Sequence, residues 1–369
     1  MAQIEFSEEQ NMLLETAGEF CKNHASIELV RASIDSEASV KPEIWKEIAD
    51  LGWLGIIVPE DFGGLGLGLS DVVPIVESMG RYLMSSPYCA TIMATQAIVS
   101  SANSEQKGHW LPKIVEGDAA TVALTEVDGS WNLDEVECEA EEDGDIIRLS
   151  GTKCFVQDLA MANWVVVSAT MKGTARLMVL DMSTVPADNY SREVVIDETR
   201  RSYRLNLDGL VVPKENLLQG SDFQSLESAA LLMLCAEISG GLMGVLPVIV
   251  EYLNTRKAFD RLIGSYQALK HPTVDILMSL EGARSHLYHA STLFSQGKYP
   301  EFQSAIRMAK AQGSEAFAFA GDRAVQFHGG FGFTYECDAQ LFLRRALWCQ
   351  YQFGDERYHR QWLAGALFD

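Results

Sequence analysis

The sequence predicts an α+β multidomain protein with an N-terminal helical domain, a middle antiparallel β-domain and a C-terminal four-helix bundle. Apolar residues recur at helical spacing near both ends of the chain, whereas short β-branched runs separated by turn residues fill its middle. Since no long helix lies between these runs, a doubly wound nucleotide-binding fold is excluded. We place the three domains at residues 1–118, 119–215 and 216–369 of the 369-residue chain.

The N-terminal domain opens with a helix-start signal at Ser7, followed by apolar positions at helical spacing. A second amphipathic helix is predicted over 41–52, with Pro42 in its first turn, where a missing N–H costs no hydrogen bond. The glycine-rich stretch 64–68 lacks the spacing and the surrounding strands of a dinucleotide-binding loop, so we interpret it as a turn. A further helix is predicted to begin at Ser70.

The middle domain contains short runs rich in β-branched residues, with turn residues such as Gly144 and Gly151 between them. Strands are predicted at 121–124, 146–149, 164–167, 175–180, 194–196 and 203–207. Long stretches with helical periodicity then predict the up-and-down bundle. These stretches are 222–254, 266–294, 300–326 and 337–354.

Composition excludes several classes of protein. A net charge of -22 argues against nucleic acid as the main partner, because phosphate binding requires a cationic face. The 7 cysteines are scattered without a C-x-x-C pair, which is typical of a reduced compartment rather than a disulfide scaffold or a zinc site. Stretch 228–250 is long and apolar, yet Glu237 and Pro247 interrupt it and no basic cluster flanks it, which favours a buried bundle helix. With no secretory signal at the N-terminus, we expect a cytoplasmic protein without membrane, metal or nucleic-acid partners.

Six segments along the chain carry a resemblance to a known family. They are 52–66, 105–112, 124–126, 151–153, 252–259 and 326–334, the last reading Gln-Phe-His-Gly-Gly-Phe-Gly-Phe-Thr. In this order they resemble the acyl-CoA dehydrogenases along nearly the whole chain. The ending 353–360 resembles a branch active on bulky or steroid-derived acyl-CoAs. The resemblance implies an FAD cofactor, a carboxylate that removes the α-proton of an acyl thioester, and an electron-transfer flavoprotein that takes the electrons.

The resemblance also implies a set of cofactor-binding residues. They are Thr125, Ser130, Phe155, Gln157, Arg256, Phe259, Gln267, Gln326, Gly329 and Gly330. Arg256 is expected to pair with the cofactor pyrophosphate, because a planar guanidinium matches phosphate oxygens. Phe155 stands where the family commonly has tryptophan against the flavin. Two departures weaken the match: the loop from Thr125 to Ser130 is one residue short, and Asp260 replaces a glycine beside the pyrophosphate.

The catalytic base departs further from the family pattern. The family's usual glutamate falls on Phe353, whose ring accepts no proton, and its alternative position falls on Ala230. Two carboxylates remain as candidates. Asp355 lies two residues beyond the lost position, and Glu237 lies deep in an apolar helix, where burial disfavours the charged form. Glu237 is alternatively a carboxylate satisfied by hydrogen bonds or by a partner cation.

These observations lead to one main hypothesis and three alternatives. The main hypothesis is an FAD-dependent acyl-CoA dehydrogenase subunit that catalyses α,β-dehydrogenation of a bulky or steroid-derived CoA thioester. The first alternative is a base-lacking partner in a heteromeric dehydrogenase, paired with another acyl-CoA dehydrogenase-like subunit. The others are a flavin monooxygenase on the same fold and a structural or regulatory subunit without flavin. In each flavin-binding case we expect a homo- or hetero-oligomer.

Overall fold

The computed structural model describes residues 8–368, and Ser7, the predicted helix start, lies outside them. The chain folds into two compact units. Unit 1 comprises the chain up to Arg31, Leu69–Met84 and the chain from Leu231 onward. Unit 2 comprises Ala32–Gly68 and Ser85–Ala230. Helices from the first third of the sequence therefore contribute to both units.

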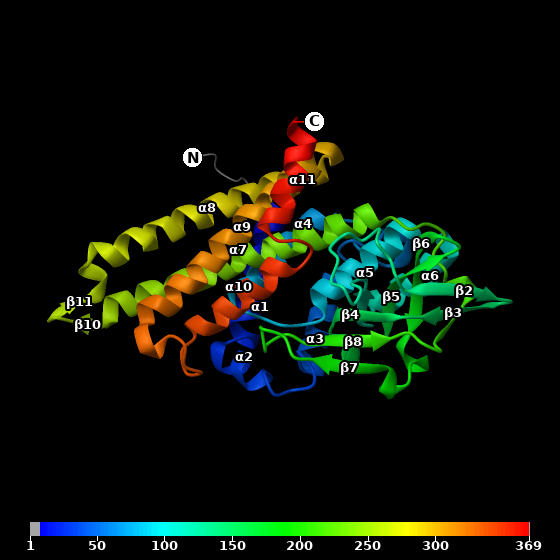
Figure 1. The fold of residues 1–369 in the computed structure, drawn as a ribbon, viewed down its shortest axis with the longest axis horizontal. Helices are drawn as coiled ribbons and strands as arrows, with labels where there is room; N and C mark the ends of the chain where they lie inside the picture. Colours follow the sequence, from blue (N-terminus) through cyan, green and yellow to red (C-terminus); the bar gives the residue numbers. More distant parts are fainter. Residues whose placement is uncertain (1–7, 369) are drawn as a thin grey trace. The chain divides into compact units, whose positions relative to one another are not determined.

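Unit 1 is built from helices. They are α1 (Glu8–His24), α4 (Leu69–Arg81), most of α7 (Phe223–Thr255), α8 (Gln267–Ser295), α9 (Tyr299–His328), α10 (Ala339–Tyr351) and α11 (Glu356–Phe368). Figure 1 shows α8, α9 and α10 as neighbouring long helices, and α9 packs against α8, α10 and α11. The predicted helices at 222–254, 266–294 and 300–326 are confirmed within one or two residues. The prediction at 337–354 was too long, because α10 ends at Tyr351 and the unpredicted α11 follows.

Helix α7 packs through its backbone as well as its side chains. A Cβ added to Gly240 would overlap the carbonyl oxygen of Glu77 in α4, and one added to Gly80 would overlap the carbonyl oxygen of Glu237. The two helices therefore cross in direct backbone contact, which only glycine allows. By length and composition α7 could span a membrane, but 67% of its most apolar window is buried inside the structure. This burial agrees with the predicted core helix.

Unit 2 combines helices with two sheets. Its helices include α3 (Pro42–Asp50), α5 (Tyr88–Ser101) and α6 (Ser104–Val115), while α2 (Ile27–Ser33) ends in it. The strands are β1 (Ala120–Ala123), β2 (Glu139–Asp143), β3 (Ile146–Ser150), β4 (Thr152–Gln157), β5 (Trp164–Met171), β6 (Thr174–Asp181), β7 (Tyr190–Glu193), β8 (Ser202–Asn206) and β9 (Val211–Pro213). A 6-stranded sheet contains β1-β5-β2-β3-β9 with β6 beside β5, and a 3-stranded sheet has the order β4-β8-β7. Buried apolar side chains from both sheets form one core.

Two details of the predicted β-domain are corrected. The larger sheet is mixed rather than antiparallel throughout, because β1 and β2 both run parallel to β5. The chain between β1 and β5 forms other strands before it returns in the same direction, which places β5 parallel to β1. The predicted strand at 194–196 does not form. The strand lies just before it, at β7, where Glu193 is in register with Ser202, and Val194 is fully exposed beyond the ladder.

Candidate cofactor and active site

In unit 2, a bulge in β4 places Phe155 at the surface. Lys153 is in register with Leu205 of β8, and Val156 with Tyr203, so β4 carries one extra residue between these pairs. Phe155 has a φ of 54° and its side chain is 41% exposed, although both flanking residues are buried. A large non-glycine residue at positive φ is a strained conformation of the kind found at binding sites. Gln157 follows two residues later, at the end of β4, and is half-buried.

Thr125 lies beside this bulge. Its carbonyl oxygen accepts a hydrogen bond of 2.9 Å from the Cys154 N–H, and the two residues form an isolated antiparallel bridge. The structure therefore brings three of the predicted cofactor residues, Thr125, Phe155 and Gln157, to one part of unit 2. Thr125 and Gln157 are half-buried and remain accessible to a ligand.

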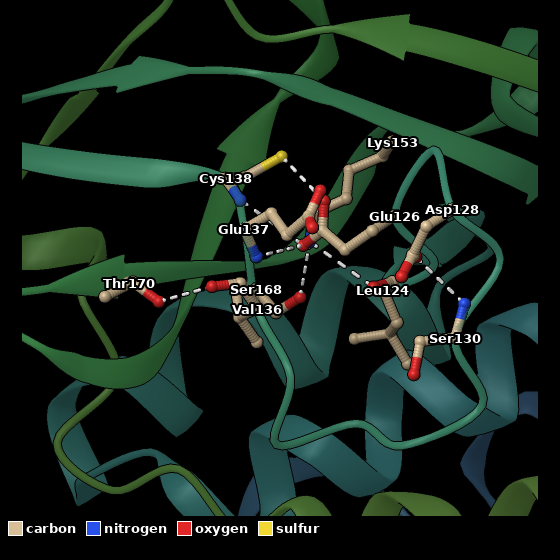
Figure 2. Close-up of polar contacts among 10 residues, drawn as sticks. All are labelled: Leu124, Glu126, Asp128, Ser130, Val136, Glu137, Cys138, Lys153, Ser168 and Thr170. Carbon is tan, nitrogen blue, oxygen red and sulfur yellow. Dashed lines mark hydrogen bonds and ion pairs between the residues drawn. The ribbon is translucent and has the colours of Figure 1, made fainter.

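A buried ion pair fixes this region from the inside (Figure 2). The Lys153 ammonium, fully buried, pairs with the Glu126 carboxylate and donates to Ser168 Oγ at 2.8 Å and to the Leu124 carbonyl oxygen at 3.3 Å. The same carboxylate accepts from the Cys138 thiol at 3.1 Å. Burial raises the pKa of that thiol to about 12. Because every charge has a partner, the cluster holds the end of β1 against β4.

Ser130 lies in the loop that follows this ion pair (Figure 2). Its N–H donates to Asp128 Oδ1 at 3.0 Å, and its hydroxyl donates to Glu135 Oε2 at 2.6 Å. These bonds form a compact turn stabilised by the loop's own polar side chains. Ser130 follows Thr125 closely in the sequence, but its hydroxyl already donates to Glu135 within the loop.

In unit 1, a cavity of about 580 Å³ lies where α7 and α9 end. It is lined by Tyr252, Arg256, Ile263, Phe327, His328, Gly329, Gly330 and Phe331. The rings of Tyr252 and His328 stack with centroids 4.0 Å apart, and His328 Nδ1 is 2.7 Å from the Ala324 carbonyl oxygen. That carbonyl only accepts, so Nδ1 carries a proton, and His328 serves in packing and hydrogen bonding. The Arg256 side chain is exposed and has no hydrogen-bond or ion-pair partner among the described residues.

The three glycines beside this cavity differ in their backbone conformation and in what an added side chain would meet. Gly329 has a φ of 61° and a ψ of −141°, a conformation that side chains rarely adopt. A Cβ on Gly332 would overlap the Val325 carbonyl oxygen, so close packing requires glycine there. Gly330 has neither constraint, because an added Cβ would meet nothing within 4 Å. It faces open space at the cavity, where a missing side chain lets a ligand approach the backbone.

Three other predicted cofactor residues lie outside the cavity lining. Phe259 is 92% exposed at the tip of the hairpin formed by β10 (Lys257–Ala258) and β11 (Arg261–Leu262), which Figure 1 shows at the end of the long helices. Phe259 and Asp260 have φ values of 53° and 60°, as a two-residue hairpin turn of the I′ type requires. Gln267 is the first residue of α8, and Gln326 lies near the end of α9 with an exposed side chain.

Both candidate base carboxylates have structural partners. Asp355 Oδ1 accepts from the Tyr358 N–H at 2.8 Å, which makes Asp355 the N-cap of α11. Glu237 is buried in α7 and forms an ion pair of 2.6 Å with the buried Arg345 of α10. The alternative interpretation of Glu237, a carboxylate satisfied by a partner cation, therefore agrees with the structure. Ala230, the family's alternative base position, is buried as well.

Sequence reasoning missed the groups beneath the turn that carries Phe353. Phe353 has a φ of 52°, and Lys310 of α9 donates to the carbonyl oxygens of Gly354 at 2.7 Å and Gln350 at 3.0 Å. Burial lowers the pKa of Lys310 to about 8. Burial and the nearby positive charges of Lys310 and Arg307 lower the pKa of His359 to about 3. No local pattern singled out Lys310, because α9 carries several charged residues and only the fold shows which of them is buried.

Comparison with known proteins agrees with this fold. Residues 7–118 match the family described as Acyl-CoA dehydrogenase, N-terminal domain, and residues 229–368 match Acyl-CoA dehydrogenase, C-terminal domain. Acyl-CoA dehydrogenase IpdE2 of Mycolicibacterium smegmatis is 29% identical over 92% of this chain and 93% of its own. A solved Tcur3481-Tcur3483 steroid ACAD is 28% identical, covers 98% of both chains and has a TM-score of 0.87. The ChsE4-ChsE5 complex from Mycobacterium tuberculosis, 22% identical, shares the fold over 99% of this chain and 98% of its own with a TM-score of 0.89.

These matches, which extend over the helical and β regions alike, define an oxidoreductase of the class that acts on acyl-CoA thioesters. The chain belongs to the acyl-CoA dehydrogenase family.

Proposed function

We propose that this chain is the subunit without a catalytic base in a heteromeric, FAD-dependent acyl-CoA dehydrogenase. One observation carries the proposal: the position expected for the base holds Phe353, while Asp355 caps α11 and Glu237 is paired with Arg345. Dehydrogenation of an acyl thioester requires a positioned group that removes the α-proton. A partner chain then has to supply that carboxylate.

The residues of this chain suit parts of FAD. Arg256 offers a guanidinium without a side-chain partner among the described residues, beside a cavity with the stacked Tyr252 and His328. A pyrophosphate would satisfy that charge, and Gly330 leaves its backbone accessible. In unit 2, Phe155 presents an aromatic ring to solvent from a strained bulge. Bound FAD supplies the acceptor for the hydride that leaves the β-carbon.

The chain's own residues would act by binding, orientation and exclusion of water. Phe155 would pack against the flavin ring, with Thr125 and Gln157 offering polar contacts on the same part of the β-domain. Arg256 would hold the pyrophosphate. Phe353 would place an apolar ring where a base usually stands, which keeps a second charged group away from the reacting carbons and excludes water. Proton removal at the α-carbon is assigned to the partner's carboxylate.

The substrate we propose is a bulky, steroid-derived acyl-CoA, with electrons passed to an electron-transfer flavoprotein in the cytoplasm. The steroid ACAD among the solved structures, and IpdE2 among the relatives, support this choice. The ChsE4-ChsE5 structure is described as a complex, which supports a heteromeric assembly. All 7 cysteines are free thiols, in keeping with a reducing compartment.

The test compares the chain alone with the chain co-expressed with the product of a neighbouring dehydrogenase-like gene. We expect the lone chain to reduce no dye with steroid-derived acyl-CoAs, and the complex to hold FAD and turn over. A lone chain with full flavin occupancy and turnover would refute the heteromer. Oxygen consumption without dye reduction would instead favour a monooxygenase, and a complex that stays colourless would favour a subunit without flavin.

A further inference from the structure

The bulge in β4 takes the Phe155 N–H out of the regular pairing with β8. One extra residue between Lys153 and Val156 interrupts the ladder with β8, so Phe155 cannot pair its N–H with that strand. Interruption of the ladder and a large residue at a φ of 54° both carry a free-energy cost. A bulge with these costs requires another group to hold it.

Glu193 of β7 provides that group. Its Oε2 accepts from the Phe155 N–H at 2.9 Å and from the buried Ser202 hydroxyl at 2.9 Å. Its Oε1 lies 3.8 Å from Arg204 Nε. Because β8 lies between β7 and β4, the carboxylate reaches across one strand to the backbone of another. The Glu193 side chain is only 16% exposed, although the Phe155 backbone that it holds lies at the surface.

The opposite side of the bulge is fixed by different groups. The Cys154 N–H donates to the Thr125 carbonyl oxygen at 2.9 Å, and Lys153 pairs with Glu126. Those contacts hold the residues before Phe155. Glu193 holds Phe155 itself, and a hydrogen bond to a charged carboxylate is stronger than one between neutral groups.

From these contacts we infer that Glu193 is a positioning residue for the cofactor. Its carboxylate fixes the Phe155 backbone in the left-handed region and thereby fixes the ring that faces the flavin. This inference rests on the proposed function, because it assigns the ring to an isoalloxazine. Without the carboxylate, the bulge is free to relax toward an ordinary β conformation, which turns the ring away from its present direction.

The experiment compares Glu193→Ala and Glu193→Gln with the wild-type chain in its flavin-loaded assembly. Asp208→Ala is the matched control, because Asp208 Oδ1 accepts from the Gly151 N–H at 2.8 Å, just before the other end of β4. The first measurement is amide hydrogen exchange in the peptide that contains Phe155, which needs no flavin. The second is the FAD dissociation constant together with the visible absorption spectrum of the bound flavin.

We expect Glu193→Ala to raise exchange at Phe155 and to weaken FAD binding by about tenfold, with a shifted flavin spectrum, since one charged hydrogen bond is lost. Glu193→Gln should recover most of both properties, because its amide oxygen still accepts from the N–H. Asp208→Ala should change neither. This rescue separates positioning from a general loss of stability.

Three results would overturn the inference, and they are distinguishable. If wild type binds FAD, and Glu193→Ala raises exchange at Phe155 with unchanged affinity and spectrum, Glu193 holds the bulge but does not position the cofactor. Unchanged exchange in Glu193→Ala would show that the carboxylate does not hold the bulge at all. If wild type binds no flavin in any assembly, the proposed function fails and takes this inference with it.

Discussion

Phe353 lies in a turn with left-handed backbone, at the position where the resemblance places the catalytic glutamate, and its ring accepts no proton. Its φ is 52°, and an L-residue in that region costs roughly 1–2 kcal/mol. Gly354 follows with a φ of 100°, and a Cβ there would crowd the Tyr358 ring. Lys310 holds this turn through the Gly354 carbonyl oxygen. Lys310 therefore holds the turn from beneath, and under the proposed function this turn faces the substrate with Phe353 where a base would stand.

Substitution of Phe353 by glutamate tests that interpretation. We expect Phe353→Glu to exchange the α-proton of an acyl-CoA with solvent about 100-fold faster than wild type, since a positioned general base contributes about 10²–10⁴-fold. The measurement is deuterium incorporation at the α-carbon by mass spectrometry, with the chain free of its partner and supplied with excess FAD. Phe353→Gln is the control, because an amide of the same shape accepts no proton. Equal rates for the two variants would show that this turn does not face the thioester.

Gly330 and Gly332 allow a matched pair of substitutions that separates cofactor binding from stability. Gly330→Ala should leave stability within about 0.5 kcal/mol of wild type, because its Cβ enters open space, yet weaken FAD binding about tenfold or more. Gly332→Ala should instead destabilise the fold by about 1–3 kcal/mol, because its Cβ overlaps the Val325 carbonyl oxygen. Chemical denaturation and flavin titration measure the two effects. If Gly330→Ala binds FAD as wild type does, the cavity backbone does not contact the cofactor.

At the scale of elements, the turn between α10 and α11 should respond to pH through Lys310. Burial lowers the pKa of Lys310 from 10.5 to about 8, so between these values the unfolded chain binds more protons than the folded one. The free energy of unfolding should therefore gain about 3 kcal/mol from this group as pH rises from 8 to 10.5. Below pH 8 the full cost of burying the charge is present. The groups facing Lys310 are Cys235 of α7, Cys349 of α10, and Asp355 and Glu356 at the start of α11.

Two variants isolate this contribution from other groups that titrate in the same range. Lys310→Met removes the charge, and Lys310→Arg keeps donors but stays protonated throughout. Both should lack the rise in stability between pH 8 and 10.5 that wild type shows in urea denaturation. Parallel pH profiles for all three proteins would mean that Lys310 titrates at its ordinary value.

The elements also show where sequence patterns were sufficient. Helices α7, α8 and α9 were predicted within one or two residues, because helical periodicity sums over some thirty positions. Helix α11 was not predicted, although Asp355 stands directly before it and caps its first turn. The strand at β7 was missed because Tyr-Ser-Arg-Glu has little β-branched character, and pairing with β8 decides its position.

Some residues of the candidate site were predictable from the sequence, and others depend on tertiary contacts. The resemblance to the acyl-CoA dehydrogenases was enough to select Arg256, Gly329 and Gly330, and the structure brings them to one cavity. No local sequence pattern predicts the role of Glu193. That role depends on a hydrogen bond across β8 to a bulge that the sequence alone does not predict. Groups that act through tertiary contacts, such as Lys310 beneath its turn, are outside the reach of local patterns for the same reason.

At the scale of the whole molecule, the negative net charge of the chain disfavours the approach of the anionic ligands that we propose. FAD and CoA thioesters are anions, and the chain has a net charge of -22, so its long-range field repels them. The hairpin after α7 carries a local exception, since Arg256, Lys257 and Arg261 lie within a few residues of one another. Salt screens the long-range repulsion first, because the Debye length falls from about 30 Å at 0.01 M to about 8 Å at 0.15 M.

The association rate of FAD with the apo-protein should therefore rise with ionic strength, by roughly threefold over that range, whereas attraction between opposite charges would make it fall. Stopped-flow fluorescence measures the rate in the assembly and with the chain alone, which separates this chain's field from that of its partner. Riboflavin, which lacks the phosphates, is the control and should show no dependence on salt. A rate that falls as salt increases would mean that the cations around Arg256, rather than the net charge, control the approach of the cofactor.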